Sequence, residues 1–150
     1  MERTLLVCKP DAVQRGRVGA ILSRFEQRGL KIAALKMVLL DDARAKKLYS
    51  VHVGKYFFDP LIEFITSSPI VAVVLEGRGA VEAARKMVGR TNSPEASAGT
   101  IRGDWGLSQR HNLVHTSDSP QSAEHEIAVL FEGDEILDYA LDTDRWTYEA

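Results

Sequence analysis

A single histidine dominates the segment with the greatest capacity for chemistry. His115 follows an apolar pair, Leu113 and Val114, which predicts a short strand, and polar residues and a helix-start signal come next. A histidine in that position is held by a rigid element yet can reach a ligand. A free imidazole is mostly neutral and nucleophilic at pH 7. His115 is therefore a candidate nucleophile or proton carrier, and a surface histidine at the start of a loop is the alternative.

One carboxylate is placed to orient that histidine. The helix predicted from Ser119 onward carries Glu126 about two turns from its start. Because a helix that directly follows a strand folds back over it, this face can meet His115. A partner on one ring nitrogen leaves the other nitrogen free to react. We therefore expect Glu126 to be the partner of His115.

Three basic residues follow or oppose predicted strand ends, although they lie far apart in the sequence: Lys9, Arg85 and Arg102. Arginine binds phosphate through paired N–H groups, and lysine acts as a point charge. Arg102 lies in what we expect to be a glycine-flanked turn. Each of these residues alone is most simply a solvated surface charge. Their association with a histidine and a glycine-rich loop favours an anion site.

Aromatic and acidic side chains suggest how a nucleotide could be held. Tyr49, Phe57 and Leu61 lie at or near a predicted helical pair. Aromatic faces stack on a nucleobase without reading its identity, and simple packing within the pair is the alternative. Asp118 could hold Mg²⁺ together with substrate phosphates, although one carboxylate is not a metal site by itself. The sequence has neither the P-loop motif nor the glycine-rich dinucleotide fingerprint.

Composition narrows the class of protein and its compartment. The chain has 150 residues, 45% hydrophobic and 27% charged, and a net charge of −2, which does not attract the whole molecule to nucleic acid or anionic lipid. Cys8 is the one cysteine, which fits a reducing compartment. No signal peptide or membrane span is expected, so we expect a cytoplasmic protein. The remaining histidines have no metal-ligand spacing and are interpreted as structural or solvated: His52, His111 and His125.

Hydrophobic periodicity predicts alternating strands and helices. Strands are expected over residues 4–8, 30–40, 70–75 and 113–114, and helices over 18–29, 42–52, 58–65, 81–89 and 119–131. Residues 90–109 are expected to form a long glycine-containing loop, which in a compact domain is usually functional. Without the inserted helical pair, the order is β-α-β-β-α-β. This predicts an α+β (α/β sandwich) protein with a ferredoxin-like fold, its four-stranded antiparallel sheet covered by helices on one face. The chain is expected to be a single domain over 1–150, with an extended tail over about 132–150.

Several motifs in a fixed order run through the whole chain. They are Glu2-Arg3-Thr4 leading to Lys9-Pro10-Asp11-Ala12-Val13; Gly16-Arg17-Val18-Gly19; Arg24-Phe25-Glu26; Phe57-Phe58; Ser68-Pro69-Ile70-Val71; Gly89-Arg90-Thr91-Asn92; Gly99-Thr100-Ile101-Arg102-Gly103-Asp104; and Asn112-Leu113-Val114-His115 followed by Ser117-Asp118-Ser119. In this order they resemble the motifs of the nucleoside diphosphate kinase family. Several motifs in one order are far more specific than any single motif.

The resemblance implies a ferredoxin-like fold and exchange of the γ-phosphate between nucleoside triphosphates and diphosphates, through a phosphohistidine at His115. It further implies that the phosphates are contacted by Lys9, Arg85, Thr91 and Arg102, and the sugar by Asn112 together with Lys9. The base would stack on Phe57 beside Leu61, and Tyr49 would lie near the γ-phosphate. Glu126 and Ser117 would support the site, and Asp118 would assist Mg²⁺ through water. One site would serve donor and acceptor in turn, in ping-pong fashion. If the base is contacted by stacking alone, the enzyme would accept purines and pyrimidines, with ribose or deoxyribose.

The resemblance also implies a homo-oligomer. The tail resembles the longer C-termini of hexameric members, so we expect a homo-hexamer, with a homo-tetramer as the alternative. The sequence departs from the family at Thr116, where a glycine is usual. A β-branched residue is poorly suited to positive φ, so we expect an altered backbone or a more crowded site there. Residues 53–56 also depart from the usual stretch before Phe57.

Two hypotheses from other functional classes remain open. A ferredoxin-like domain can bind nucleotide or single-stranded nucleic acid without catalysis. The aromatic pattern of RNA-binding sheets is missing, and the net charge is slightly negative, so no obligatory nucleic-acid or membrane partner is expected. A phosphohistidine carrier that passes phosphate to proteins is the other alternative. It predicts labelling of His115 but poor transfer to nucleoside diphosphates.

Overall fold

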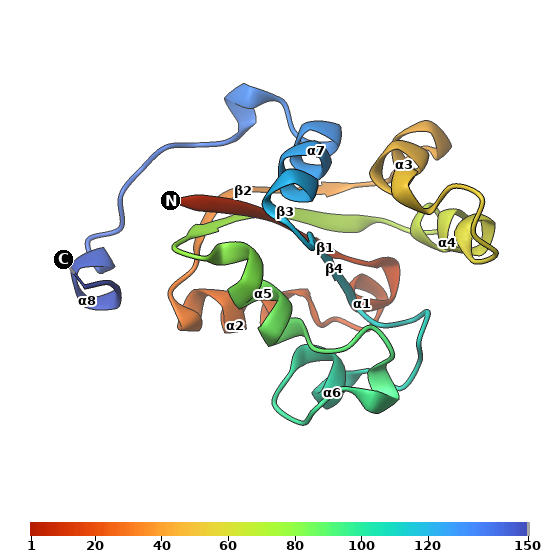
Figure 1. Cartoon of the computed structure of the whole chain (residues 1–150), viewed down its shortest axis with the longest axis horizontal. Helices are drawn as coiled ribbons and strands as arrows, with labels where there is room; N and C mark the ends of the chain where they lie inside the picture. The colour runs from red at the N-terminus through yellow and green to blue at the C-terminus, as the bar shows by residue number, and fades with distance from the viewer. Residues whose placement is uncertain (150) are drawn as a thin grey trace.

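A four-stranded antiparallel sheet in the order β2-β3-β1-β4 forms the centre of the molecule (Figure 1). The computed structural model describes residues 1–149. Its strands are β1 (Glu2–Cys8), β2 (Lys31–Val38), β3 (Ile70–Gly77) and β4 (Val114–Thr116). Its α-helices are α1 (Pro10–Gln14), α2 (Val18–Arg28), α3 (Asp42–Leu48), α4 (Phe58–Ile65), α5 (Ala80–Val88), α6 (Ile101–Trp105), α7 (Pro120–Leu130) and α8 (Asp144–Thr147). Short 3-10 turns are η1 (Ser50–His52), η2 (Ser93–Glu95) and η3 (Gly133–Glu135).

Helices cover both faces of this sheet. Figure 1 shows α2, α5 and α6 on one side, and α3 and α7 on the other. The predicted ferredoxin-like order is confirmed, but the expectation of helices on one face only is wrong. The reason is that the inserted pair, α3 and α4, packs with α7 against the second face. None of the described helices is long and apolar enough to cross a membrane.

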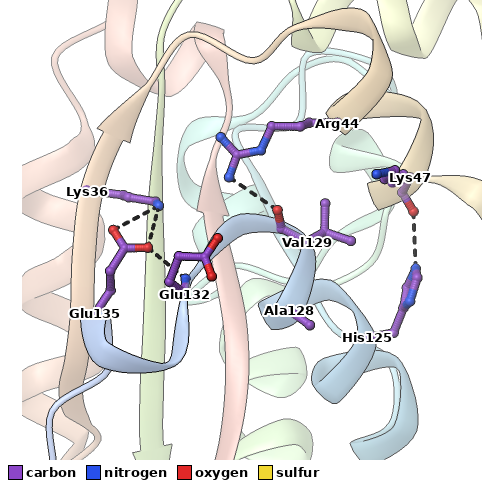
Figure 2. A pocket seen from close by; sticks show the side chains of 8 residues that line it. All are labelled: Lys36, Arg44, Lys47, His125, Ala128, Val129, Glu132 and Glu135. Atoms are coloured by element: carbon purple, nitrogen blue, oxygen red, sulfur yellow. Dashed lines mark hydrogen bonds and ion pairs between the residues drawn. The ribbon is translucent and has the colours of Figure 1, made fainter.

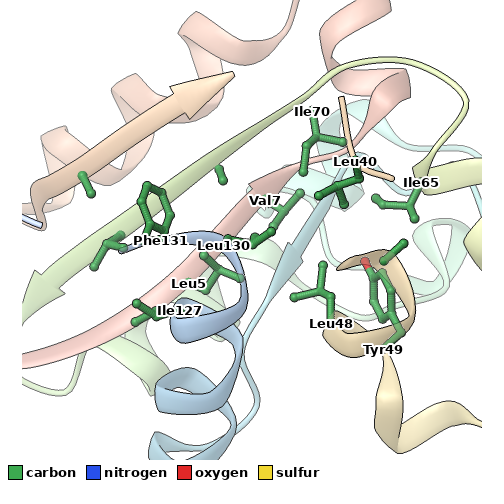
Figure 3. Close-up of a cluster of buried hydrophobic side chains, with 14 of the residues drawn as sticks. Leu5, Val7, Leu40, Leu48, Tyr49, Ile65, Ile70, Ile127, Leu130 and Phe131 are labelled. Atoms are coloured by element: carbon green, nitrogen blue, oxygen red, sulfur yellow. The ribbon is translucent and has the colours of Figure 1, made fainter. Parts of the chain in front are cut away.

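Alternation along β1 builds two hydrophobic cores, one on each face of the sheet. Leu5 and Val7 pack with residues of α3, α4 and α7 (Figure 3), whereas Leu6 and Cys8 pack with residues of α1, α2, α5 and α6. Successive side chains of a strand point to opposite faces, so a strand covered on both sides is apolar throughout. All eight residues of β3 are buried, which confirms the sequence prediction for this strand.

The helix ends follow the local signals in the sequence. The Asp41 carboxylate accepts a hydrogen bond of 2.7 Å from the Arg44 amide at the start of α3. The Ser119 hydroxyl accepts one of 3.1 Å from the Ser122 amide, ahead of a proline in the first turn of α7. Gly29 ends α2 in the left-handed conformation, with φ of 101°. These are the usual devices for satisfying free backbone groups at helix ends.

Three segments expected to lack helix contain short ones, and the first of them is α1, which follows β1. Residues 90–109 hold η2 and α6, and the Thr100 hydroxyl caps α6 by accepting from the Gly103 amide at 3.0 Å. The tail holds η3 and α8, and it packs on β2, where the Leu137 amide donates to the Ala33 carbonyl at 2.9 Å. Helices of three to five residues are too short to show a hydrophobic period, which is why the pattern missed them.

The strand that carries His115 lies one or two residues later than predicted. Its span is Val114–Thr116, and Thr116 pairs with Leu6 in extended conformation. Thr116 therefore does not need positive φ, and a β-branched residue suits its place in the strand. A more crowded site around Thr116 stays a prediction. Leu113, expected in the strand, instead has φ of 74° and is the one non-glycine residue of positive φ in the described chain.

Candidate functional site

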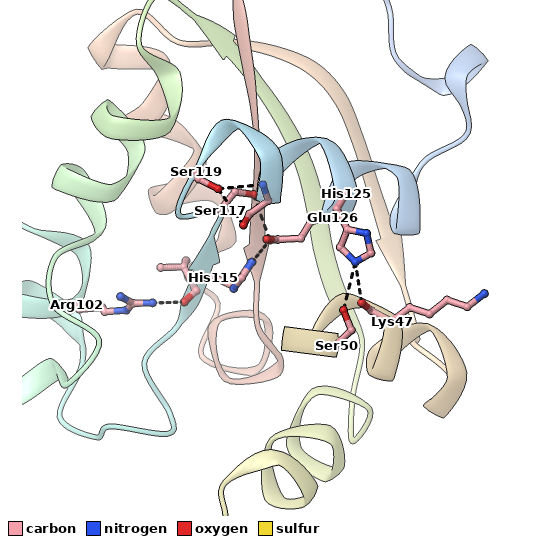
Figure 4. A network of polar contacts seen from close by, with 10 residues as sticks. Lys47, Ser50, Arg102, His115, Ser117, Ser119, His125 and Glu126 are labelled. Atoms are coloured by element: carbon pink, nitrogen blue, oxygen red, sulfur yellow. Dashed lines mark hydrogen bonds and ion pairs between the residues drawn. The ribbon is translucent and has the colours of Figure 1, made fainter. Parts of the chain in front are cut away.

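His115 occupies the middle of β4, which presents it to a cleft. Its neighbours Val114 and Thr116 are buried, while its own side chain is 20% exposed. Nε2 of the ring is hydrogen-bonded to Oε1 of Glu126 on α7 (Figure 4). Within residues 1–149, Nδ1 has no hydrogen-bond partner. A carboxylate on Nε2 holds the proton there and leaves the Nδ1 lone pair free.

Glu126 is itself fixed by a second donor. The hydroxyl of Ser117, which is fully buried, donates to the same Oε1 at 3.2 Å. Helix α7 follows β4 after a short connection and packs against β1, as expected of a helix that folds back over its strand. The structure thus brings together His115, Glu126 and Ser117, which lie in one region of the sequence. The two hydrogen bonds fix the carboxylate and, through it, the plane of the imidazole.

The rings of Tyr49 and His52 lead from His115 toward Phe57. The Tyr49 ring meets the His115 ring edge-on, with centroids 5.4 Å apart. His52 stacks against Tyr49 at 6.2 Å and meets Phe57 edge-on at 5.1 Å. The Tyr49 hydroxyl is buried and has no partner among the described residues, and burial raises its pKa. An unpartnered hydroxyl beside His115 is available to a bound ligand.

Lys9, which follows β1, is a buried cation without a carboxylate partner among the described residues. Its Nζ donates to Oδ1 of Asn112 at 2.9 Å, and Nδ2 of Asn112 donates to the Thr91 carbonyl at 2.9 Å. Burial, followed by the nearby charge of Arg102, lowers the pKa of Lys9 to about 7 from its ordinary value of 10.5. An anion in the cleft would favour the charged form of this lysine.

Arg102 lies in α6 and not in the open turn that the sequence suggested. Three of its five donors bind backbone carbonyls, those of Gly89 at 3.0 Å, Asn112 at 3.2 Å and Val114 at 2.6 Å. Burial, with a smaller contribution from Arg85, lowers the pKa of Arg102 to about 10. The guanidinium therefore ties the start of β4 to the end of α5 and keeps two donors for a ligand.

More exposed polar groups complete this side of the cleft. Arg85, Thr91 and Asp118 are exposed and line it. A hydrogen bond from the Ser122 hydroxyl, followed by the charge of Arg85, lowers the pKa of Asp118, so this carboxylate is ionised at neutral pH. Within residues 1–149, no three His, Cys, Asp or Glu side chains gather as metal ligands. A cation here would take its remaining ligands from water and from the phosphates of a substrate.

The cleft has a volume of about 960 Å³, at the upper end of the range of small-molecule sites. It gathers every site residue proposed from the sequence except Ser117, which lies behind Glu126. These residues are Lys9, Tyr49, Phe57, Leu61, Arg85, Thr91, Arg102, Asn112, His115, Asp118 and Glu126. They come from four α-helices (α4, α5, α6 and α7), from β4 and from the segments between elements, so no single stretch of sequence contains the site.

Sequence reasoning missed several residues of the cleft wall. His52 and His111 were interpreted as structural or solvated, yet both line the cleft, and residues 108–110 lie beside His111. The His111 ring packs against the Phe64 ring in a tilted arrangement, with centroids 4.8 Å apart. The position of His52, three residues after Tyr49 on the same predicted helical face, was the available signal. His125, in contrast, binds the Lys47 carbonyl outside this cleft.

A second hollow, of about 590 Å³, lies between α3, α7 and β2 (Figure 2). Several of its charges are already used within the protein. Lys36 pairs with Glu135 at 3.0 Å, and Arg44 donates to the Val129 and Leu130 carbonyls at the end of α7. The Arg44 contacts satisfy free carbonyls at the end of α7. They leave fewer free groups for chemistry than the cleft around His115.

Comparisons with known proteins agree on one family. The model of the family described as "Nucleoside diphosphate kinase" matches residues 2–136. A curated protein of that name from Pelotomaculum thermopropionicum is 54% identical over 149 residues, covering 99% of this chain and all of the relative, and one from Roseiflexus castenholzii is 50% identical with the same coverage. The solved structure of a halophilic nucleoside diphosphate kinase from Halobacterium salinarum in complex with CDP is similar, with a TM-score of 0.97, 44% identity and coverage of 99% of both chains.

Proposed function

The chain belongs to the nucleoside diphosphate kinase family, and from this premise we propose which of its residues carry the reaction. It is a phosphotransferase that moves the γ-phosphate of a nucleoside triphosphate to a nucleoside diphosphate. The observation that carries the assignment is the His115 imidazole, fixed through Nε2 to Glu126 in a cleft that also holds Lys9, Arg85 and Arg102. His115 is the nucleophile.

The reaction proceeds in two balanced half-reactions. Nδ1 of His115 attacks the γ-phosphorus, a P–N bond forms, and the bond to the bridging oxygen breaks to release the diphosphate. A second nucleoside diphosphate then binds in the same cleft. Its terminal β-phosphate oxygen attacks the phosphohistidine, the P–N bond breaks, and a new triphosphate leaves. Glu126, supported by Ser117, keeps the proton on Nε2, so Nδ1 enters each cycle as a free lone pair.

Fixed positive charge supplies most of the expected acceleration. The transition state of phosphoryl transfer spreads charge over three oxygens, so positioning and cations matter more than proton transfer. Lys9, Arg85, Arg102 and Thr91 surround the phosphates in this proposal. Lys9 and Asn112 also contact the sugar, and the Tyr49 hydroxyl points to the γ-phosphate. The Lys9 and Arg102 side chains are held in place by hydrogen bonds before substrate binds, so they need little reorganisation, and the bound phosphates favour the charged form of Lys9.

The base is held by stacking. Phe57, with Leu61 beside it, offers a half-buried ring. It lies at the far end of the row of aromatic rings that starts at His115. Because stacking is tolerant of sequence, we propose that the enzyme accepts purines and pyrimidines, with ribose or deoxyribose. This tolerance suits an enzyme whose donor and acceptor differ in base.

We propose Mg²⁺ as the accompanying cation. A single ionised carboxylate, Asp118, beside a phosphate site matches the preference of Mg²⁺ for water, phosphate and few carboxylates. Asp118 would hold the ion through water, and the ion would offset charge on the nucleotide phosphates. Asp118→Asn should raise the Mg²⁺ concentration needed for half-maximal activity. An unchanged requirement would remove Asp118 from this role.

One labelling experiment tests the assignment against its alternatives. The protein is incubated with ATP labelled in the γ-phosphate, the acid-labile label on the protein is measured, and unlabelled GDP is added. We expect label on His115 that chases into GTP, and no label on His115→Ala. A stable label that GDP does not remove would instead identify a carrier that passes phosphate to proteins. No label at all would identify a non-catalytic binding module for nucleotide or single-stranded nucleic acid.

We also propose a homo-oligomer, hexameric in preference to tetrameric. Edge strand β2 and the residue after it expose a row of apolar side chains, with Leu35 at 52%, Met37 at 63% and Leu39 at 64%. An exposed apolar edge strand invites pairing with another chain. Light scattering coupled to gel filtration distinguishes six, four and one subunits. The single buried thiol, Cys8, is consistent with our proposal of a cytoplasmic protein.

A further inference from the structure

The backbone just before β4 adopts a strained turn. The Val114 amide donates to the Asn112 carbonyl at 2.9 Å, two residues back, and the intervening Leu113 has φ of 74°. This combination defines a γ-turn of the rarer, strained kind. Leu113 is fully buried, and a bulky residue at positive φ is unfavourable. The turn lies between Asn112, which contacts Lys9, and His115.

Such strain persists only where the surroundings enforce it. Four contacts from other elements hold this turn. The Leu113 carbonyl accepts from the Lys9 amide at 2.8 Å, and Arg102 donates to the carbonyls on either side of Leu113. The remaining group, the Leu113 amide, donates to Oδ2 of Asp11 at 3.0 Å. Of these contacts, this hydrogen bond alone uses a side chain with no other task in the proposed mechanism.

We propose that Asp11 is a positioning residue, whose carboxylate holds Leu113 in the strained turn and thereby sets the position of His115 relative to Lys9 and Arg102. The proposal rests on His115 being the nucleophile. Asp11 lies in the first turn of α1, directly after β1, which also pairs with β4. One carboxylate thus connects the two strands at the point where the chain enters the site.

The other oxygen of Asp11 strengthens this interpretation. Oδ1 is buried and has no hydrogen-bond partner among the described residues. A carboxylate kept half-desolvated for a single backbone hydrogen bond is costly to the fold. That cost is offset by ordering a backbone that would otherwise relax. Relaxation of Leu113 to negative φ would turn the adjoining peptides and move the His115 side chain.

A rival explanation assigns Asp11 a purely electrostatic role. Its charge acts on Lys9 and Arg102, and it raises the pKa of each. Two substitutions separate the roles. Asp11→Asn removes the charge but keeps an oxygen that can accept from the Leu113 amide, whereas Asp11→Ala removes both. Asp144→Ala is the matched control, because Asp144 is also an acid in the first turn of a short helix, α8, outside the cleft.

The first readout is the single-turnover rate of His115 phosphorylation by ATP. Displacement of a reacting atom by about 1 Å can cost on the order of 100-fold in rate. We expect Asp11→Ala to slow phosphorylation by about 10- to 100-fold, with a much smaller change in the dissociation constant for ADP. Asp11→Asn should restore most of the rate, and Asp144→Ala should match the wild type. Equal losses in Asp11→Asn and Asp11→Ala would overturn the proposal in favour of the charge.

A second substitution tests the strain directly. Glycine adopts positive φ without steric cost, so Asp11→Ala should slow phosphorylation several-fold less in a Leu113→Gly background than in the wild type. An equal loss in both backgrounds would contradict the proposal. If loss of the buried leucine prevents folding, the comparison of Asp11→Asn with Asp11→Ala still decides.

The third readout is hydrogen exchange at the Leu113 amide, which does not depend on the identity of the nucleophile. Exchange should be slow in the wild type and in Asp11→Asn, and much faster in Asp11→Ala. Unchanged protection in Asp11→Ala would overturn the proposal whatever the activity. Absence of label on wild-type His115 would instead overturn the assignment of the nucleophile and leave the exchange result to test the role of Asp11 in the turn.

Discussion

The two ends of the cleft are built in opposite ways. In the phosphate region (Lys9, Arg102, His115 and Glu126), side chains are largely buried, and each is held by hydrogen bonds from other elements. In the base region (residues 55–57 and Leu61), Tyr56 is 91% exposed, and the contacts of Phe57 are mainly with other rings. Preorganised charge stabilises a transition state, whereas a loose aromatic wall holds a base without selecting it.

The largest effect should come from removing a cation of the phosphate region. Lys9→Met should lower kcat/KM for ATP by about 10²- to 10³-fold, the usual range for losing one preorganised charge donor. Lys55→Met removes a cation from the base region and is the matched control, with an expected change below about threefold. Steady-state kinetics measures both. Similar losses in the two variants would remove the distinction between the regions.

A smaller and different effect is expected in the base region. Phe57→Ala should raise KM by roughly tenfold, since stacking on one aromatic side chain contributes about 1–3 kcal/mol, while kcat stays within about threefold. The rise should be similar for ADP, GDP, CDP and UDP. A rise in KM confined to one of these nucleotides would show that the base region recognises base identity, contrary to the difference between the two regions described above.

Thr116 tests how tightly the phosphate region is packed. Thr116→Gly should change turnover by less than about tenfold, on the order of 1.4 kcal/mol, because Thr116 lies in an extended strand and its backbone is unstrained. Its side chain is buried and lines the cleft. A hundredfold change in kcat would show that this side chain shapes the site around His115.

Lys9 in the phosphate region should take up a proton when nucleotide binds. Its pKa of about 7 leaves it mostly neutral at pH 8. Binding of ADP places negative phosphates nearby and raises this pKa, so complex formation at pH 8 should take up on the order of one proton. Calorimetry in buffers of different ionisation enthalpy measures the uptake, and Lys9→Met should abolish it. Proton release, or uptake that survives in Lys9→Met, would contradict the lowered pKa.

The sequence could predict those features that depend on residues close together in the chain. Strands such as β3 and helices with clear caps carry their own signals, so they were placed correctly. The meeting of Glu126 with His115 followed from a strand and helix adjacent in the chain. The helix α6 around Arg102 was missed because five residues show no period.

The strained Leu113 was missed for a different reason. Nothing in its residue type signals positive φ, which is enforced by Asp11, Lys9 and Arg102 from distant parts of the chain. The second layer of helices was likewise unpredicted, because helical periodicity reveals an apolar face but not the sheet face that it covers. Tertiary contacts, and not local preference, decide both features.

The position of the phosphoryl group on the His115 ring tests the central claim most directly. Nε2 is bound to Glu126 and Nδ1 is free, so phosphorylation should occur at Nδ1. ¹⁵N and ³¹P NMR of the phosphoenzyme, prepared with ATP from protein labelled at histidine, distinguishes the two nitrogens. We expect a phosphorus–nitrogen coupling to Nδ1 of His115. Phosphate on Nε2, or on any other residue, would contradict it.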